Sequence, residues 1–423
     1  MARLAIVGAG WAGLAAGVQA IRAGHAVSVF EMAPVPGGRA RSVRHDGEVL
    51  DNGQHILIGA YVSSLALMRE VGVDPDRVLH RQPLALVDTR GDGLVLRAGP
   101  ARLAFARALL GHPSWSWSER LSLVRAGLAW GWSGFEAAPS TTVQALCRAL
   151  APAVTRELVE PLCIAALNTP ASEASAQVFL KVLRDGLFGE RGCADLLLPR
   201  VSLGELFPQP AWRWLQRHGA RLHARTRVSS VDREAGGAWL VCGERFDGVI
   251  LACSAREASR LARSHAPDWA SSVSDLRHEA IATVVLDCPG ARLAAAMVSL
   301  SDGPAQFAFD QGALGARPGR FTFVVSGAAP WLESGSDALA QAVLEQARMA
   351  FPAGTWPTPP VLRACITERR ATFACVAGLR RPPQRVAAGL AAAGDYVQGP
   401  YPATLEGAVR SGLEAAGCMG STS

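Results

Sequence analysis

Three glycines near the N-terminus have the spacing of a pyrophosphate-binding turn. Residues 8–13 read G-A-G-W-A-G and follow the short apolar run 4–7, which is typical of a buried strand. Gly8 permits a tight turn, Gly10 lets the backbone approach a pyrophosphate, and Gly13 lets the next helix pack closely on the strand. At the start of that helix, Trp11 and Ala12 would present free N–H groups to the phosphates.

A carboxylate stands where the second strand of such a unit would end. Residues 12–23 are predicted to be helical and residues 26–30 to form a strand, which Glu31 follows. A carboxylate about 20 residues past the glycines can accept hydrogen bonds from both hydroxyls of an adenosine ribose. An exposed glutamate at a strand end is the simpler alternative, but the glycines favour dinucleotide binding.

A second pair of glycines, Gly37 and Gly38, precedes Arg39. The glycines let the chain pass against a bulky cofactor, and the Arg39 guanidinium can neutralise its diphosphate through paired hydrogen bonds. A domain that binds NAD does not need this element. The sequence therefore predicts FAD, although an ordinary Pro-Gly turn would also fit the stretch.

The C-terminal end carries a second set of cofactor candidates. Gly394 and Asp395 close a strand predicted at 389–394, and Thr404 and Leu405 open a helix predicted at 402–416. Asp395 would bind ribityl hydroxyls, while the helix N-terminus would face the pyrimidine end of a flavin and stabilise negative charge on its reduced form.

These elements indicate an α/β fold, a Rossmann-like FAD-binding domain with an interleaved α+β substrate domain. The FAD-binding domain is expected in three pieces, 1–80, 201–258 and 386–423, and the substrate domain at 81–200 and 259–385. Further strands are predicted at 226–231, 246–252, 281–286 and 320–325. Residues 154–185 are expected to be largely helical, with breaks at Pro161 and Pro170.

Composition excludes several classes of protein. The chain has 423 residues, of which 49% are hydrophobic and 18% charged, so it can bury a large core and is not disordered. The net charge is +6, but no dense basic run is present, so nucleic-acid binding is not expected. Nine scattered cysteines without a CxxC pair suggest reduced thiols in a cytoplasmic protein, with no metal site. The uncharged stretch 4–21 contains four glycines, so it is not interpreted as a membrane anchor.

The motifs together resemble the superfamily of FAD-dependent amine oxidases and phytoene desaturases. Several further stretches are similar to one branch, the hydroxysqualene dehydroxylases of hopanoid and squalene biosynthesis. They lie at 51–55, 165–170, 196–200, 368–373 and 394–407, and the resemblance extends from residue 3 to about residue 416.

The resemblance implies reductive removal of the allylic hydroxyl of hydroxysqualene, which gives squalene while reduced FAD is oxidised. It implies a hydrophobic triterpene substrate, a cavity that excludes water, and an acid for the leaving hydroxyl. It also implies cofactor contacts at Gly53, Gln54 and Val228, and it places His55 beside the flavin ring. His55 is the catalytic candidate, with a structural role as the alternative.

Each of three other polar residues has a role in the site as one interpretation and an equally good or simpler structural role as the other. Asp51 would hold His55 or cap a turn, and Asn168 would orient a polar group or end a helix. Tyr401 would line the site, although core packing is the simpler interpretation. The electron donor is not identifiable, because no second nucleotide motif is present; NAD(P)H, a ferredoxin or a quinol would each fit.

The stretch 101–135 suggests contact with a membrane surface. Four arginines and four tryptophans alternate there with aliphatic residues, and an amphipathic, basic and aromatic segment can lie in a bilayer interface. An ordinary helical face with buried tryptophans is the alternative. With the lipophilic substrate, the expectation is a cytoplasmic protein that attaches peripherally to the inner face of the cell membrane.

Other functions are retained as alternatives. A carotenoid-type or phytoene-type desaturase would run the flavin in the opposite direction, and a lipid carrier would retain FAD without turnover. An amine oxidase is disfavoured because the chain has only three tyrosines for an aromatic cage. An NAD-dependent dehydrogenase would be colourless when purified.

Overall fold

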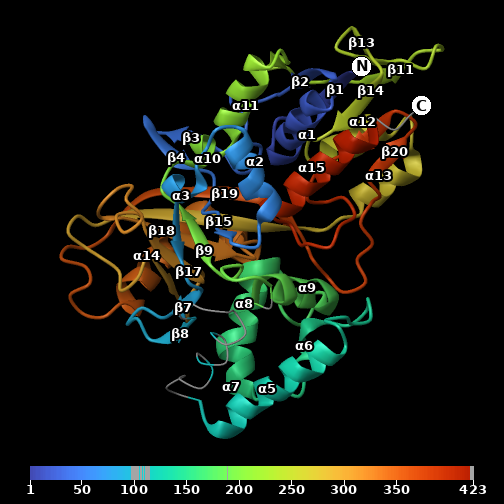
Figure 1. Ribbon diagram of the computed structural model, residues 1–423. Coiled ribbons are helices and arrows are strands. Elements are labelled where there is room, and N and C mark those ends of the chain that lie inside the picture. Colours follow the sequence, from blue (N-terminus) through green and yellow to red (C-terminus); the bar gives the residue numbers. More distant parts are fainter. Residues whose placement is uncertain (97–103, 105–106, 108, 110–114, 188, 420–423) are drawn as a thin grey trace.

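The computed structural model describes residues 1–96, 104, 107, 109, 115–187 and 189–419 (Figure 1). A six-stranded sheet forms the nucleotide-binding part, in the order β10-β2-β1-β14-β21-β20, and it is parallel except at β20. Its strands are β1 (Arg3–Val7), β2 (Ala26–Phe30), β10 (Arg221–His223), β14 (Gly248–Leu251), β20 (Arg385–Ala387) and β21 (Leu390–Ala392). Three distant stretches of chain therefore build one sheet, and the boundaries predicted for the three pieces stay a prediction.

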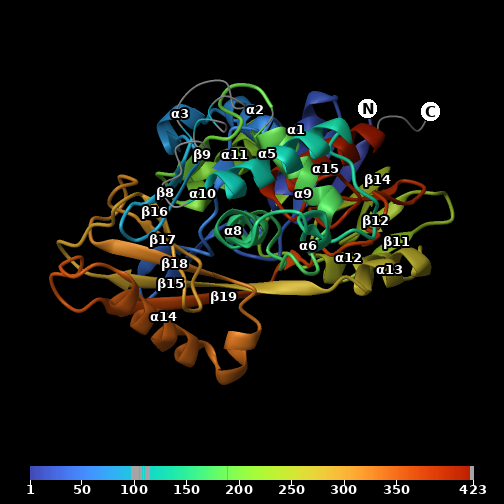
Figure 2. The same ribbon diagram turned by 90° about the horizontal axis from the view of Figure 1, so that it is seen from below.

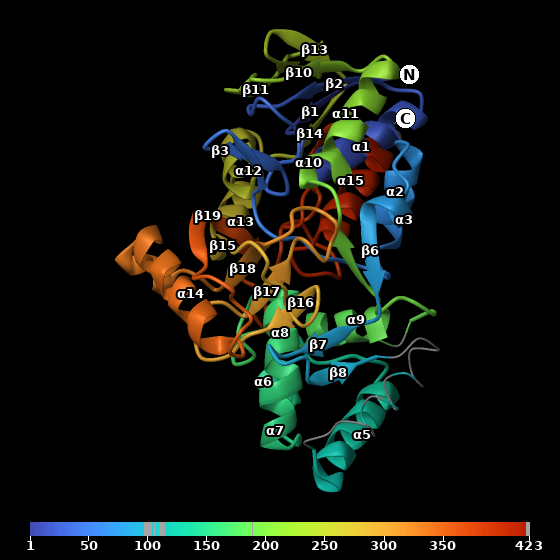
Figure 3. The same ribbon diagram turned by 90° about the vertical axis from the view of Figure 1, so that its left-hand side faces the viewer.

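Three helices pack side by side on this sheet (Figures 1 and 3): α1 (Trp11–Arg22), α11 (Pro208–Arg217) and α15 (Leu405–Met419). Helices α1 and α15 approach closely because Gly412 lacks a side chain. A Cβ atom on Gly412 would lie 2.1 Å from the backbone oxygen of Ala12. This contact places the C-terminal helix α15 directly against α1, the first helix of the chain.

A second, antiparallel sheet has the order β16-β17-β18-β15-β19. Its strands are β15 (His278–Asp287), β16 (Met297–Ser299), β17 (Phe307–Asp310), β18 (Arg320–Ser326) and β19 (Val361–Phe373). Helix α14 (Ser336–Ala350) covers its outer face, as Figure 2 shows, and buries Leu339 and Val343 there. The inner face turns toward a group of helices.

That helical group lies at the opposite end of the molecule from the first sheet (Figures 1 and 3). It consists of α5 (Trp117–Trp132), α6 (Val143–Leu146), α7 (Pro152–Val154), the π-helical turn η1 (Thr155–Val159), α8 (Glu160–Leu167) and α9 (Ala176–Leu187). The predicted break at Pro161 is wrong. The helix continues through this proline because the π-turn before it accommodates the ring and the missing N–H.

Shorter elements complete the fold. The strands are β3 (Ser42–His45), β4 (Glu48–Asp51), β5 (Leu57–Ile58), β6 (Leu79–Gln82), β7 (Ala85–Val87), β8 (Gly93–Val95), β9 (Leu196–Pro199), β11 (Val231–Arg233), β12 (Trp239–Val241) and β13 (Glu244–Phe246). The helices are α2 (Val62–Glu70), α3 (Pro75–Val78), α10 (Leu203–Leu206), α12 (Ala255–Ala262), α13 (Pro267–Ser274) and the 3-10 helix η2 (Pro330–Ser334).

The strand predicted at 226–231 is wrong, because β10 ends before it and β11 begins at its last residue. In the predicted stretch 101–135, residues 101–103, 105–106, 108 and 110–114 lie outside the described residues.

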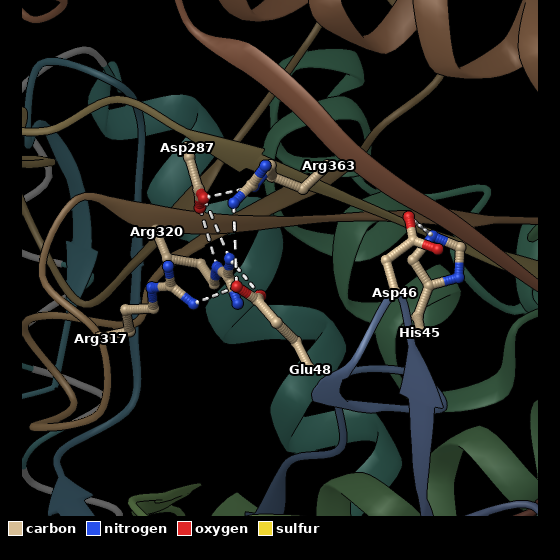
Figure 4. A network of polar contacts seen from close by, with 7 residues as sticks. All are labelled: His45, Asp46, Glu48, Asp287, Arg317, Arg320 and Arg363. Carbon is tan, nitrogen blue, oxygen red and sulfur yellow. Dashed lines mark hydrogen bonds and ion pairs between the residues drawn. The ribbon is translucent and has the colours of Figure 1, made fainter.

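An ionic network joins the β3–β4 hairpin to the outer end of the second sheet (Figure 4). The carboxylate of Glu48 contacts Arg317 at 3.0 Å and Arg320 at 2.9 Å. Arg320 also pairs through two nitrogens with Asp287, at 2.8 and 2.9 Å, and Arg363 contacts the same carboxylate at 2.8 Å. Arg320 contacts both carboxylates and is only 8% exposed, so it is the central cation of this network.

The network predicts how stability depends on pH. Hydrogen bonds from Arg317 and Arg320 lower the pKa of Glu48. Burial would raise the pKa of Asp287, but the hydrogen bond from Arg320 and the charges of the neighbouring arginines together outweigh burial and lower it. Both folded pKa values lie below the unfolded ones, so the stabilisation is present above about pH 4 and is lost as the pH falls further. Thermal melts from pH 7 to pH 3 should show this loss. Asp287→Asn should reduce its steepness, and an unchanged acid limb in that variant contradicts the assignment.

Candidate functional site

A cavity of about 650 Å³ extends from the first sheet to the helical group. Every predicted cofactor residue except Gly13 lines it. These residues are Gly8, Gly10, Trp11, Ala12, Glu31, Gly37, Gly38, Arg39, Gly53, Gln54, Val228, Gly394, Asp395, Thr404 and Leu405, together with His55. Segments that are far apart in the sequence thus meet around one space.

The two glycine loops touch each other at the start of α1. Gly10 and Gly37 form a parallel β-bridge, and the Gly37 N–H donates to the Ala9 carbonyl at 2.8 Å. Gly8 has φ +106°, and a Cβ there would lie 2.6 Å from the Ala252 carbonyl oxygen. Gly13 lies beneath the loop, where a Cβ would be 2.0 Å from the Gly8 oxygen. These two positions therefore require glycine for the fold itself.

Gly10 differs from these two glycines. It has φ −71°, which any residue adopts, and the nearest atom to a Cβ built on it is the Gly38 Cα at 3.8 Å. Gly10 is also the N-cap of α1, where no side chain caps the helix and the first turn carries no acid. Open space beside uncapped backbone N–H groups fits a bound diphosphate.

Glu31 is fixed at the edge of the cavity by the backbone. Its two carboxylate oxygens accept hydrogen bonds from the N–H groups of Ala9 and Ala33, both at 2.7 Å. Each oxygen retains a lone pair that can accept from a ribose hydroxyl. Arg227 and Val228 also line the cavity, and the preceding residue, Thr226, donates its N–H to the Glu31 carbonyl at 2.8 Å. This arrangement fits the adenosine half of FAD.

Arg39 and Asp395 form an ion pair with each other. The second guanidinium nitrogen donates to Asp395, and the first donates to the Ala371 carbonyl at 2.6 Å. Burial alone would lower the pKa of Arg39, but the charge and hydrogen bond of Asp395 outweigh it and raise the pKa. The pair therefore joins the first and last segments of the site. Contacts of Arg39 to a diphosphate and of Asp395 to ribityl hydroxyls stay predictions.

His55 is a neutral side chain in this site. Burial lowers its pKa to about 4, and its Nδ1 lies 3.4 Å from the Gly53 carbonyl oxygen. Gln54 accepts a hydrogen bond from Gln311 at 3.0 Å. Asp51 does not contact His55; its carboxylate accepts hydrogen bonds from Ser42 and from the Leu203 N–H. The imidazole can therefore donate a hydrogen bond at neutral pH, but it is not a charged acid.

The far half of the cavity is mainly apolar. Helices α8 and α9 and the inner face of the second sheet supply its walls, which include Leu162, Ile164, Leu183, Leu187, Met297, Phe307, Phe309 and Val324. Asn168 lines this half, but its amide donates to Thr372 at 2.8 Å and accepts from the Gly327 N–H at 3.1 Å. With φ 46° it ends α8, as the helix-terminating alternative predicted.

Two polar side chains of the apolar half form a pair that the sequence did not reveal. The Tyr401 hydroxyl donates to the Asp185 carboxylate at 2.7 Å, and both residues line the cavity. The only indication in the sequence was that Asp185 follows Lys181 by one helical turn. This spacing is common for ion pairs on exposed helices, and it does not point to Tyr401. Within the described ranges, no group of three or more His, Cys, Asp or Glu side chains is placed to hold a metal ion.

Comparisons with known proteins agree on the fold. The family model "Flavin containing amine oxidoreductase" matches residues 11–420. A hydroxysqualene dehydroxylase of Rhodopseudomonas palustris is 28% identical over 97% of this chain and 96% of its own length. A probable zeta-carotene desaturase of Synechococcus elongatus is 27% identical, over 57% of this chain and 54% of its own. A crystal structure of an oxidoreductase from Methanosarcina mazei, 16% identical, has a TM-score of 0.76 and covers 97% of this chain and 99% of that one.

Proposed function

Because the chain belongs to the flavin-containing amine oxidoreductases and is an FAD-dependent oxidoreductase, we propose that it reductively removes the allylic hydroxyl of hydroxysqualene. The product is squalene. The observation that carries this proposal is one cavity whose first half fits FAD and whose second half is mainly apolar. The similarity to a hydroxysqualene dehydroxylase over nearly the whole length of both chains supports this substrate.

The proposed reaction balances with one two-electron donor. The C–O bond breaks, the oxygen takes up one proton and leaves as water, and the allylic carbon accepts a hydride. When bound, reduced FAD supplies that hydride, and the proton released on its oxidation balances the proton consumed. Apolar walls such as Leu183 and Phe309 keep bulk water from the allylic cation.

The decisive experiment is incubation of the FAD-loaded protein, reduced with dithionite, with hydroxysqualene. Mass spectrometry should detect squalene in an amount equal to the flavin oxidised. Flavin that stays reduced while the alcohol is recovered unchanged contradicts the proposal. A desaturase is the second candidate, and it predicts the opposite result: oxidised flavin reduced by a polyene precursor. The desaturase similarity over about half of each chain supports it less.

We propose His55 as the catalytic group that donates a hydrogen bond to the leaving hydroxyl. His55→Ala should keep its flavin and lose activity by about 10²-fold or more, the usual effect of removing a positioned proton donor. The pKa of about 4 predicts that turnover shows no inflection near pH 6.5. Flavin absorbance at 450 nm serves as the control for cofactor content. Wild-type turnover in this variant would contradict the catalytic role and indicate that His55 is structural.

We further propose that the protein takes its substrate from a membrane surface through α5. Trp117, Leu121, Val124, Leu128 and Trp132 form one exposed face of this helix, here called the α5 stripe. The two tryptophans at its ends are 72% and 88% exposed. The opposite face is buried at Leu123 and Trp130. Such a stripe of large apolar side chains suits the plane of a bilayer.

Charge and position favour anionic lipid as the occupant of this face. Arg120, whose guanidinium lies 5.0 Å from the Trp117 ring centre, and the exposed Arg125 flank the stripe. Helix α5 lies at the end of the molecule away from the nucleotide sheet (Figure 3) and contacts α7, which continues through η1 into the cavity-lining α8. Among the described residues, no helix is long and apolar enough to cross a membrane.

Replacing both end tryptophans should weaken vesicle binding. Trp117→Ser/Trp132→Ser should reduce partitioning to anionic phosphatidylglycerol vesicles at least tenfold, because burial of one large apolar side chain is worth about 1.5–3 kcal/mol. Co-sedimentation measures the bound fraction. Trp331→Ser, which removes an exposed tryptophan of η2, is the matched control and should bind as wild type. Equal binding of the double variant, or a dimer that depends on the stripe, contradicts the membrane proposal.

A further inference from the structure

A charged cluster interrupts the apolar wall of the cavity where α9 faces the loop before α15. It consists of Lys181, Asp185 and Tyr401, here called the α9 cluster. Lys181 is the only lysine of the chain. Its ammonium lies 3.0 and 2.8 Å from the two oxygens of Asp185, and Asp185 also accepts the Tyr401 hydroxyl at 2.7 Å. Asp185 and Tyr401 both line the cavity.

The ring of Tyr401 is held by cations as well as by its hydroxyl. The Lys181 ammonium lies 5.5 Å from the ring centre and the Arg410 guanidinium 5.1 Å from it, both within the range of cation–π attraction. Arg410 is held in turn by Glu406 at 2.8 Å. These contacts fix where the phenol oxygen lies and leave little rotational freedom to the side chain.

The Tyr401 phenol is a protonated group whose hydrogen already has a partner. Burial and the hydrogen bond to Asp185 raise the pKa of Tyr401 to about 12, so the group stays protonated at physiological pH. Its one hydrogen is committed to Asp185. A phenolic oxygen that donates its hydrogen still has lone pairs to accept another hydrogen bond. Tyr401 therefore offers an acceptor on a cavity wall that is otherwise formed largely by Leu162, Leu183 and Leu187.

We propose that the Tyr401 hydroxyl accepts a hydrogen bond from the hydroxyl of the substrate alcohol and makes the cavity prefer the alcohol to its hydrocarbon product. Asp185 is the positioning residue, since it orients the phenol. This inference rests on the proposed function. A substrate hydroxyl donates one hydrogen and accepts others, so Tyr401 as acceptor and His55 as donor do not compete for the same atom. Sites that bind a hydroxyl discriminate against analogues that lack it.

Equilibrium binding to the oxidised, FAD-loaded protein tests the inference without turnover. Hydroxysqualene and squalene are each titrated in detergent micelles, and the flavin spectrum reports occupancy. The wild-type protein should bind the alcohol about tenfold more tightly, the value of one hydrogen bond of about 1.4 kcal/mol. Tyr401→Phe keeps the ring and both cation contacts, and it should bring the ratio of the two affinities close to one.

Two further variants separate the roles in the cluster. Asp185→Asn can still accept from the phenol and should keep most of the preference, whereas Asp185→Leu should lose it. Tyr61→Phe removes the hydroxyl of another tyrosine that lines the cavity and should keep the wild-type ratio. A wild-type ratio in Tyr401→Phe overturns the inference even if the protein makes squalene. Absence of squalene in the turnover assay, with the binding ratio intact, contradicts only the proposed function.

Discussion

Gly10→Val is expected to give a folded protein that purifies without flavin. The chain alone tolerates a side chain at Gly10, because a Cβ there comes no closer than 3.8 Å to the Gly38 Cα and the backbone is extended. The valine methyls would occupy the space between the two glycine loops, where the diphosphate is predicted to pass. Flavin retention should fall at least tenfold, which corresponds to about 1.4 kcal/mol or more of binding free energy.

Gly13→Ala is the matched contrast. Its Cβ would lie 2.0 Å from the Gly8 carbonyl oxygen and 3.1 Å from the Ala252 Cβ, so α1 has to shift away from the sheet. Overpacking of this kind costs about 1–3 kcal/mol or more of stability. Bound flavin itself stabilises the folded state, so the melting temperatures are compared for the flavin-free proteins. The value should fall in Gly13→Ala and stay near wild type in Gly10→Val. Full flavin content in folded Gly10→Val contradicts the diphosphate assignment.

Local rules explain why much of the nucleotide-binding part could be predicted. Strand β2 has the predicted bounds, and β1 and α1 lie within one residue of theirs, because a buried apolar run, a glycine turn and a helix are each specified by neighbouring residues. The predicted fold class and the FAD cofactor are confirmed by the family match and the similar solved structures. Glu31 could be singled out as a candidate because its distance from the glycines is fixed by one βαβ unit, and its contact with a ribose stays a prediction.

Contacts between distant segments could not be predicted in the same way. Arg39 and Asp395 are 356 positions apart, and Tyr401 and Asp185 are 216 apart. No local pattern specifies such pairs, because they depend on how whole elements pack. Each of the four residues is ordinary in its own neighbourhood. The sequence therefore suggested cofactor roles for Arg39 and Asp395 separately, without their ion pair.

The tryptophans near α5 illustrate a further limit. Their spacing indicates an amphipathic helix, but it does not tell which apolar side chains pack inward. Trp115 and Trp130 are buried, whereas Trp117 and Trp132 are exposed. The sequence offered membrane contact and core packing as alternatives for the whole stretch. Core packing therefore holds for the two buried tryptophans, and membrane contact stays a proposal for the two exposed ones.

Glu406 is expected to contribute more to stability than its place in a C-terminal motif suggests. It is fully buried, and its carboxylate accepts hydrogen bonds from the N–H groups of Ser63 and Ser64, from the Ser64 hydroxyl and from Arg410, at 2.7 to 3.0 Å. Helix α2 begins after Tyr61, which provides no side-chain cap. Glu406 thus caps α2 from another helix and compensates its dipole.

Glu406→Leu should destabilise the protein by about 3–5 kcal/mol, because it leaves two helix N–H groups and a partly buried guanidinium without their acceptor. Glu406→Gln keeps one acceptor oxygen but turns an amide toward the same donors, so its loss should be smaller. Urea unfolding followed by tryptophan fluorescence gives both values. Arg410→Met is the control, since the carboxylate then retains its three hydrogen bonds to α2. If Glu406→Leu lowers the free energy of unfolding no more than Arg410→Met does, the cap is not the main role of Glu406.

The loss of stability in Glu406→Leu should be accompanied by weaker flavin retention. Thr404 and Leu405 line the cavity directly before Glu406, so a shift of α15 would displace them.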